Sequence, residues 1–267
     1  DKSAFMTIKA NEIDRLDDFG YKSNVMGFSL GTKFEYKNDL RLGLEYENLV
    51  EKIETDSTAS ILQQGQKGNY FDNFLILDFD YDKRNQRYQT NDGFRSNYDM
   101  KIPLISETNT FTQSYNFKTF HELYENNITT FSYSLTTSNS LSGENIKLSE
   151  RLYIPSKSLR GFERGKVGPK DGNDFIGGNY LGSFNFTTTL PFILDDVQNF
   201  DGLFFFDAAN LWGVDYDSSI DNSNKIRSSV GVGLDWLTPV GPLSFSLAAP
   251  LTKVDTDIEE TFRFNLG

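Results

Sequence analysis

Apolar and polar residues alternate along most of this chain. In the range 26–36, for example, Met26, Phe28 and Leu30 share one face, while small and charged residues occupy the other. A period of two is typical of a β-strand whose two faces have different surroundings. No stretch predicts a convincing helix. The pattern predicts twelve strands, at 4–10, 26–36, 40–47, 75–81, 94–104, 111–118, 131–135, 184–190, 204–206, 226–236, 243–247 and 262–266.

The connections between these predicted strands differ greatly in length. Residues 37–39 and 238–242 form short turns, whereas the ranges 51–70 and 142–176 are long and polar, and a further polar connection covers 11–24. Strands with one continuous apolar face, joined by loops that are short at one rim and long at the other, are typical of a transmembrane β-barrel. We therefore predict an all-β fold, an antiparallel transmembrane β-barrel.

Aromatic residues close to the ends of the predicted strands support this interpretation. Tyr36, Tyr46, Tyr81 and Trp236 lie where the aromatic girdle of a membrane barrel meets the lipid–water interface. The alternative is a soluble β-sandwich with Greek-key connections. A sandwich would not need twelve strands of this regularity, so we favour the barrel.

Composition excludes several classes of function. The chain has 267 residues, with 38 acidic and 26 basic side chains, a net charge of −12, no cysteine and one histidine. An acidic surface argues against nucleic acid as a partner, since phosphate binding needs a basic face. His121 alone cannot build a metal site or a catalytic triad, and we interpret it as an ordinary strand-end residue. We expect no enzyme activity, no catalytic or metal site and no cofactor.

The loop at 142–176 is the strongest candidate for a functional segment, because a connection of this length is usually either functional or disordered. It contains Leu159, Arg160, Gly161 and Phe162 in succession. Gly161 permits a tight turn, and its apolar neighbours could pin the loop tip to a wall. Arg160 offers a planar fork suited to a carboxylate. The alternative is an exposed arginine on a solvated loop.

Three motifs in this loop resemble one protein family. The segments 159–162 (Leu-Arg-Gly-Phe), 167–169 (Val-Gly-Pro) and 177–179 (Gly-Gly-Asn) resemble the long sixth extracellular loop of the BamA family of outer-membrane protein assembly factors. The segment 206–212 (Phe-Asp-Ala-Ala-Asn-Leu-Trp) is similar to the next strand of that family, and 227–245 is similar to its last hairpin. These matches run in order through the second half of the chain.

The resemblance implies a barrel of about sixteen strands preceded by periplasmic POTRA domains, integral to the outer membrane of a Gram-negative bacterium. Residues 1–267 would then be part of such a barrel domain, with a long extracellular loop at about 142–177 and with the POTRA domains and the first strands absent. Family members usually end with an aromatic residue shortly after the position of Gly267, where this chain stops. Because strand 4–10 would be an interior strand, we expect the isolated chain to insert into lipid poorly.

The family resemblance also implies a function. Such a protein would fold and insert client outer-membrane proteins by strand templating, in which a client strand adds to the edge exposed at a lateral seam. Its partners would be unfolded outer-membrane proteins, accessory lipoproteins and the lipid bilayer. The main alternative is a TamA-like translocation and assembly module or a two-partner secretion transporter of the same superfamily. A passive porin is a further alternative.

The site residues follow from the loop and from the strand pattern. We expect Arg160 to enter the lumen and pair with Asp207, which lies on the inward face of its strand because Phe204 and Phe206 point outward. Thr187 stands where many family members carry a glutamate, so the pairing is expected to rest on Asp207 alone. The functional loop is Leu159, Arg160, Gly161 and Phe162, and the seam strand comprises Phe262, Phe264, Leu266 and Gly267. Lipid-facing positions are Val232, Leu234, Phe245 and Phe264, and lumen-facing positions are Ser229, Gly231, Ser246 and Asn265.

Overall fold

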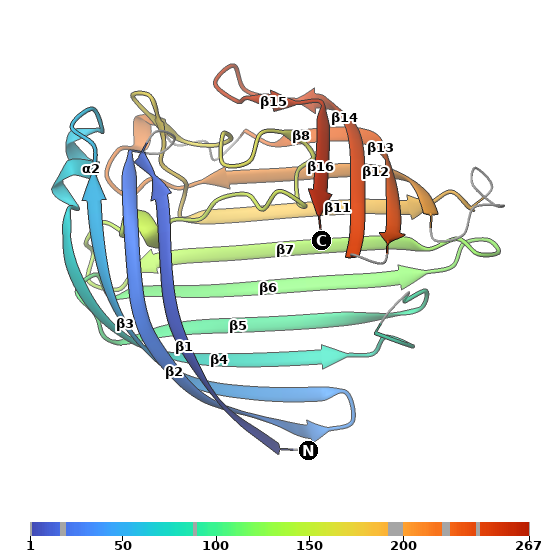
Figure 1. Cartoon of the computed structure of the whole chain (residues 1–267), viewed down its shortest axis with the longest axis horizontal. Coiled ribbons are helices and arrows are strands. Elements are labelled where there is room, and N and C mark those ends of the chain that lie inside the picture. Colours follow the sequence, from blue (N-terminus) through green and yellow to red (C-terminus); the bar gives the residue numbers. More distant parts are fainter. Residues whose placement is uncertain are drawn as a thin grey trace.

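A single antiparallel sheet of twelve strands forms the body of the protein and curves around the long loop (Figure 1). The computed structural model describes residues 2–16, 20–87, 90–191, 200–220, 225–238 and 241–266. Every strand pairs with its sequence neighbour within the sheet, apart from the short strands that belong to loops. The predicted fold class and the predicted strand number are therefore confirmed.

The sheet is built from strands of very different length. In order across the sheet they are β1 (Lys2–Arg15), β2 (Tyr21–Lys37), β3 (Leu40–Thr55), β4 (Gly68–Asp82), β5 (Gly93–Ile105), β6 (Thr110–His121), β7 (Thr129–Ser140), β11 (Tyr180–Thr189), β12 (Phe200–Trp212), β13 (Arg227–Thr238), β14 (Gly241–Thr252) and β16 (Phe262–Leu266). Loop elements are the helix α2 (Ile61–Gly65), the 3-10 turns η1 (Leu148–Glu150) and η3 (Ser218–Ile220), and the two-residue strands β8 (Gly161–Phe162), β9 (Lys170–Asp171), β10 (Asp174–Phe175) and β15 (Glu259–Glu260).

Three expectations about the connections were wrong. The polar range 11–24 is mostly strand, because β1 and β2 stay paired as far as Arg15 opposite Tyr21. The range 51–70 holds the end of β3, the start of β4 and the helix α2, where no helix was expected. The physical reason is that backbone hydrogen bonds between strands continue beyond the apolar part of each strand. In these strand ends both faces are polar, so apolar and polar residues no longer alternate. α2 is too short for helical periodicity to show.

The two faces of the sheet carry the predicted residues. Leu234, Phe245 and Phe264 lie opposite one another on neighbouring strands, on the outward face, where Phe264 is half exposed. Gly231 and Ser246 lie on the inward face, together with Ser229, which is fully buried. Asn265 and Ser246 both line an inward cavity. The predicted assignment of lipid-facing and lumen-facing positions is thus confirmed by the register.

The two rims of the sheet differ, although less strictly than the sequence suggested. One rim, called here the loop rim, carries the connections β3–β4, β7–β11 and β12–β13, and the last strands approach the long loop there (Figure 1). The opposite rim has the tight turn at Asn38–Asp39. However, the β5–β6 connection at 106–109 on the loop rim is short, and the β4–β5 connection at 83–92 on the opposite rim is longer. A strict alternation of short and long loops was therefore an incorrect expectation.

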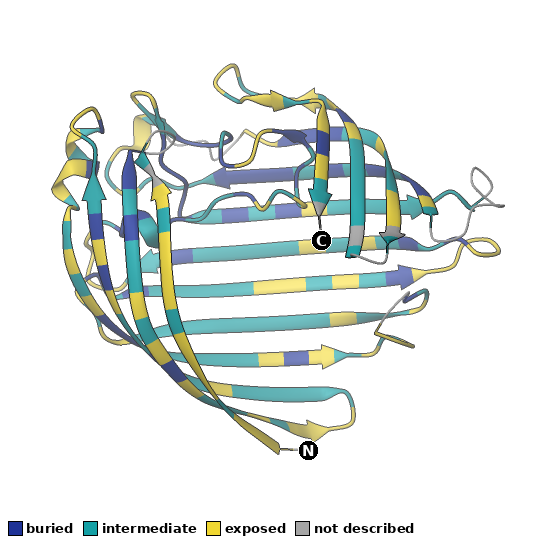
Figure 2. Ribbon diagram, viewed as in Figure 1, coloured by how far each residue is buried: buried dark blue, intermediate teal, exposed yellow. Residues whose placement is uncertain are grey.

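The sheet has two edges, β1 and β16. Within the described residues, β1 pairs with β2 and β16 pairs with β14, and neither pairs with the other. Both edge strands are largely exposed, whereas buried positions gather on the long loop and on β12 (Figure 2). Among the described residues, no helix is long and apolar enough to cross a membrane.

Candidate functional site

The long loop between β7 and β11 packs its tip against the inner face of the sheet (Figure 1). Leu159 and Phe162 are almost fully buried there. The apolar cluster around them combines loop residues with inward-facing residues of β11 and β12: Ile154, Leu159, Phe162, Val167, Leu181, Ala209 and Leu211. The prediction that apolar neighbours of Arg160 pin the tip to a wall is confirmed.

Gly161 makes this close approach possible. Its φ of +88° is a conformation that residues with a side chain rarely adopt. A Cβ at this position would lie 3.2 Å from the Cβ of Ala248 and 3.3 Å from the Cβ of Ser229. The loop backbone therefore lies directly on β13 and β14 at this point, and a side chain here would push it away.

Arg160 and Asp207 are brought together by this arrangement. The Arg160 Nε donates to Oδ2 of Asp207 at 2.7 Å, and Nη2 donates to Oδ1 at 2.7 Å, so the guanidinium grips both carboxylate oxygens. The backbone N–H of Arg160 adds a third bond to Oδ2, at 3.0 Å. Asp207 is fully buried, and the Arg160 side chain is 17% exposed. Bidentate pairs of this kind fix direction as well as charge.

Neighbouring strands complete the surroundings of the pair. The Arg160 guanidinium lies 3.5 Å from the centre of the Phe205 ring, a cation–π contact. Asn185 donates to Asp207 Oδ1 at 2.8 Å, and Ser229 donates to the carbonyl oxygen of Arg160 at 2.5 Å. Thr187 also takes part, accepting a long bond of 3.4 Å from Arg160 Nη2. Among the described residues the ion pair of Arg160 is with Asp207, as expected, and Thr187 adds a neutral hydrogen bond to it.

The sequence analysis placed Ser229 on the inward face but predicted neither its contact with the pair nor that of Asn185. They occupy one row across three strands, because Asn185 pairs in register with Asp207 and Asp207 pairs with Ser229. Period two shows which face a residue lies on, but it does not show which residues are opposite one another. The sequence therefore shows that such residues point inward, but it does not show which residues of neighbouring strands lie side by side.

The hairpin between β14 and β16 meets the same loop tip. β8, which contains Gly161 and Phe162, pairs with β15 of this hairpin. Arg263 of β16 donates through Nε to Glu260 at 2.7 Å, and its other two nitrogens donate to the carbonyl oxygens of Ser156 and Phe162. The terminal strand thus reaches the loop through Arg263, which the sequence analysis did not single out.

The predicted seam residues themselves do not touch the loop in any contact that the structure records. Phe262 and Phe264 are about half exposed on the opposite face of β16. Leu266 pairs with Leu243 through the backbone, and its side chain lies outside the described residues, as does the whole of Gly267. The functional role proposed for this strand stays a prediction.

The base of the loop is attached at a different place on the wall. Lys147 Nζ lies 2.5 Å from Asp72 of β4 and 3.0 Å from Glu51 of β3, and all three side chains are buried. Burial alone would lower the Lys147 pKa, but the carboxylates of Glu150, Glu51 and Asp72 outweigh burial and raise it. The ammonium group is therefore charged at neutral pH.

Two further arginines tie the loops at this rim together. Arg151 of the long loop pairs with Asp215 of the β12–β13 connection and donates to Asn179 at 3.2 Å. Arg227 and Asp257 form a fully buried pair, with bonds of 2.9 and 3.0 Å. The first contact joins two connections, and the second ties the β14–β16 connection to the start of β13.

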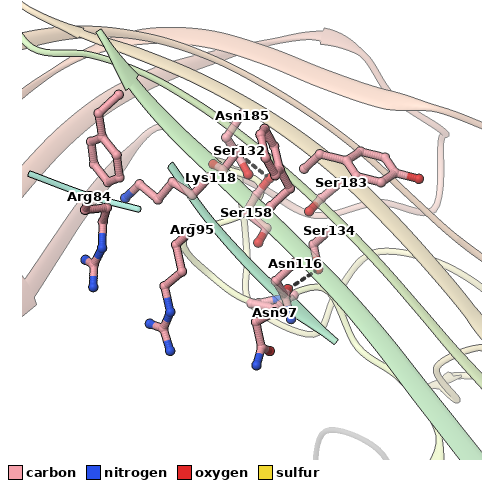
Figure 3. Close-up of a pocket in the computed structure, with 14 residues that line it drawn as sticks. Arg84, Arg95, Asn97, Asn116, Lys118, Ser132, Ser134, Ser158, Ser183 and Asn185 are labelled. Atoms are coloured by element: carbon pink, nitrogen blue, oxygen red, sulfur yellow. Dashed lines mark hydrogen bonds between the residues drawn. The ribbon is translucent and has the colours of Figure 1, made fainter. Parts of the chain in front are cut away.

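An inward-facing cavity of about 540 Å³ lies beside the loop tip, and its walls are polar (Figure 3). Asn185 of the wall donates to the carbonyl oxygen of Ser158 in the loop at 2.9 Å, and Lys118 and Ser132 also line this space. Its remaining labelled residues are Arg84, Arg95, Asn97, Asn116, Ser134 and Ser183. The described residues contain no group of three acidic, histidine or cysteine side chains placed to hold a metal ion.

Comparison with known proteins identifies the fold and the family. The family model for the Omp85 superfamily domain matches residues 2–267. The outer membrane protein assembly factor BamA of Neorickettsia risticii (strain Illinois) is 30% identical over 128 residues, which is 47% of this chain and 17% of that protein. BamA of Neisseria meningitidis serogroup B is 29% identical over 137 residues, 41% of this chain and 17% of that protein.

A solved structure agrees with the fold over almost the whole chain. The crystal structure of BamA from Haemophilus ducreyi, lacking POTRA domains 1–3, has a TM-score of 0.86 at 23% identity, and covers 98% of this chain and 58% of that one. The match shows that the twelve-stranded sheet has the same fold as part of that structure. These findings confirm the resemblance to the BamA family and show an integral outer-membrane protein. Since the family model covers nearly every residue, the chain belongs to the Omp85 superfamily.

Proposed function

We propose that this protein folds and inserts other β-barrel proteins into the outer membrane. The observation that carries the proposal is the bidentate contact of Arg160 with Asp207, which holds the long loop on the inner wall next to the terminal strands. Two of the relatives that match the chain are outer membrane protein assembly factors. Because the aligned part spans 17% of each of these relatives, the activity of the whole protein is a proposal.

The mechanism that we propose is strand templating at a lateral seam. A strand edge presents unpaired N–H and C=O groups, and an extended client strand can pair with them. Each added client strand buries its apolar face in lipid, which supplies the driving force without a nucleotide. The terminal strand β16 would take part in this seam with Phe262 and Phe264 facing lipid.

The larger arrangement is proposed on the same basis. The chain would form part of a barrel of about sixteen strands that works with periplasmic POTRA domains, with accessory lipoproteins and with unfolded outer-membrane clients. The long loop, including Leu159 to Phe162, would be extracellular at its base and would enter the lumen at its tip. The TamA-like module and the two-partner secretion transporter are alternatives within the same superfamily, and they differ in what happens to the client.

Reconstitution distinguishes these functions. The full-length protein is placed in liposomes, and an unfolded β-barrel client is added outside them. A heat-modifiable gel shift then measures the fraction of client that has folded in the membrane. We expect faster client folding than in empty liposomes. A secretion transporter would instead carry a soluble client into the vesicle lumen, where protease cannot reach it, and that result without client insertion would contradict the proposal.

A further inference from the structure

The terminal strand β16 is attached to the loop tip by one buried side chain. We propose that Arg263 is a positioning residue that couples β16 to the loop, so that the strand and the tip of the loop move together. The coupling is a property of the structure, and its importance for client insertion rests on the proposed function. The coupling would control opening of the seam, because β16 could move away from β14 only if the loop tip were released from Arg263.

Arg263 contacts its own hairpin and two points of the long loop. Its Nε donates to Glu260 Oε2 at 2.7 Å, and its terminal nitrogens donate to the backbone oxygens of Ser156 and Phe162. The residue is only 7% exposed. An arginine remains charged at any accessible pH and carries five donors in a fixed plane. Burial of such a group requires these acceptors, so the position of the loop backbone determines where β16 can lie.

The rest of β16 is weakly held. The strand has five residues, and among the described residues it pairs with β14 alone. The preceding hairpin adds backbone contacts at the rim, where Glu163 donates to Ile258 at 2.8 Å and Ile258 donates to Lys166 at 3.1 Å. Those contacts belong to the hairpin, whereas Arg263 is part of the strand itself. Glu259 and Glu260 of β15 also pair with Phe162 and Gly161 just before β16 begins. Arg263 adds to this backbone pairing a contact with the loop from within β16 itself.

The loop tip connects Arg263 to the opposite part of the wall. Phe162, whose carbonyl oxygen accepts from Arg263, follows Arg160 by two residues, and Arg160 grips Asp207 on β12. A movement of β16 must break the Arg263 contacts, or it must pull the tip away from Asp207. Coupling of this kind is reciprocal, so a change at Arg160 should also be felt in β16.

Hydrogen–deuterium exchange tests the coupling in the full-length protein in lipid nanodiscs. In Arg263→Ala, we expect the amides of 262–266 and of 160–163 to exchange roughly tenfold faster or more, since loss of hydrogen bonds from a charged group opens both segments. Arg263→Lys keeps the charge but has no fork, and should give an intermediate increase. The matched control is Arg95→Ala, since Arg95 lies on a strand and grips Asp80 of the neighbouring strand. It should leave both segments unchanged.

A second pair of variants distinguishes loss of the coupling from general misfolding of the Arg263 variant. Arg160→Ala leaves Arg263 intact and should still speed exchange in 262–266. Glu260→Gln keeps both backbone acceptors of Arg263 and should speed exchange in the same amides by less than Arg263→Ala does. The proposal is overturned if Arg263→Ala changes the loop alone, or if Arg160→Ala leaves β16 unchanged.

Client insertion by the same variants separates the coupling from the proposed function. Faster exchange together with altered client insertion supports both. If exchange rises as expected while client insertion equals that of the unmodified protein, the coupling stands and the proposed role of the seam fails. Unchanged exchange in both segments would overturn the coupling whatever the insertion rate.

Discussion

The long loop is attached to the inner wall by two cations, and the two attachments differ in kind. At the tip, Arg160 grips both oxygens of one carboxylate, Asp207, and stacks on Phe205. At the base, Lys147 lies between two carboxylates on neighbouring strands, Glu51 and Asp72. The tip contact requires a particular direction of approach, whereas the base contact requires a positive charge within reach. The base contact therefore tolerates changes in geometry, whereas the tip contact depends on the exact position of Asp207 on the wall.

The largest effect should follow from removing the base cation. Lys147→Met leaves two buried carboxylates without their partner, and breaking a buried pair in this way typically costs about 3–5 kcal/mol. The unfolding temperature in detergent, followed by heat-modifiable gel shift, should fall clearly. Lys52→Met is the matched control, because Lys52 pairs with Glu54 on the exposed part of β3. A fall of equal size in both variants would show that the base cluster has no special role.

Removing the tip carboxylate should have the next largest effect. Asp207→Ala leaves the Arg160 guanidinium without its partner, but this side chain is 17% exposed and can turn toward the polar cavity, so we expect a cost of about 3 kcal/mol or less. Limited proteolysis of the loop should become faster near 157–166. If the variant failed to fold as a barrel, instead of only loosening the loop, the proposed difference between tip and base would be contradicted. The tip contact would then be required for the folding of the sheet.

Exchanging the two cations sharpens the comparison. Arg160→Lys loses the second parallel bond and the stacking on Phe205, and should cost roughly 1–2 kcal/mol. Lys147→Arg keeps the charge among its carboxylates and should cost less. Proteolysis rates at the tip and at the base measure the two effects separately. Equal costs would mean that direction matters no more at the tip than at the base.

The smallest expected effect concerns pH. The folded-state pKa of Lys147 is raised above the ordinary value for a lysine, because the surrounding carboxylates outweigh burial. A raised pKa contributes stability that is fully present below the unfolded-state value and is lost only as the pH rises through the folded-state value. Protease resistance of the loop base should therefore be constant between about pH 7 and 10. Loosening within that interval, absent from Lys147→Met, would contradict this assignment.

The contact at the loop tip could be predicted from the sequence, whereas the contact at the loop base could not, and the reasons are physical. Arg160 stands in a local motif, and the inward direction of Asp207 follows from the period of two around it. Lys147 meets Glu51 from 96 residues away, and Arg263 meets loop carbonyl oxygens that have no side-chain signature. Such contacts depend on the register and on the path of the loop. The helix α2 was missed because its start is set by a capping box between Ser60 and Gln63 rather than by periodicity.

The central claim is that the Arg160–Asp207 pair seats the loop for client assembly. A charge exchange in the full-length protein tests it most directly, with Arg160→Glu, Asp207→Arg and the double variant, and with Arg95→Glu as the control. Client folding in liposomes is measured for each. We predict that each single reversal slows client folding, that the double variant restores much of the rate, and that the control changes little. Unimpaired single variants, or a double variant no better than either single one, would contradict the claim.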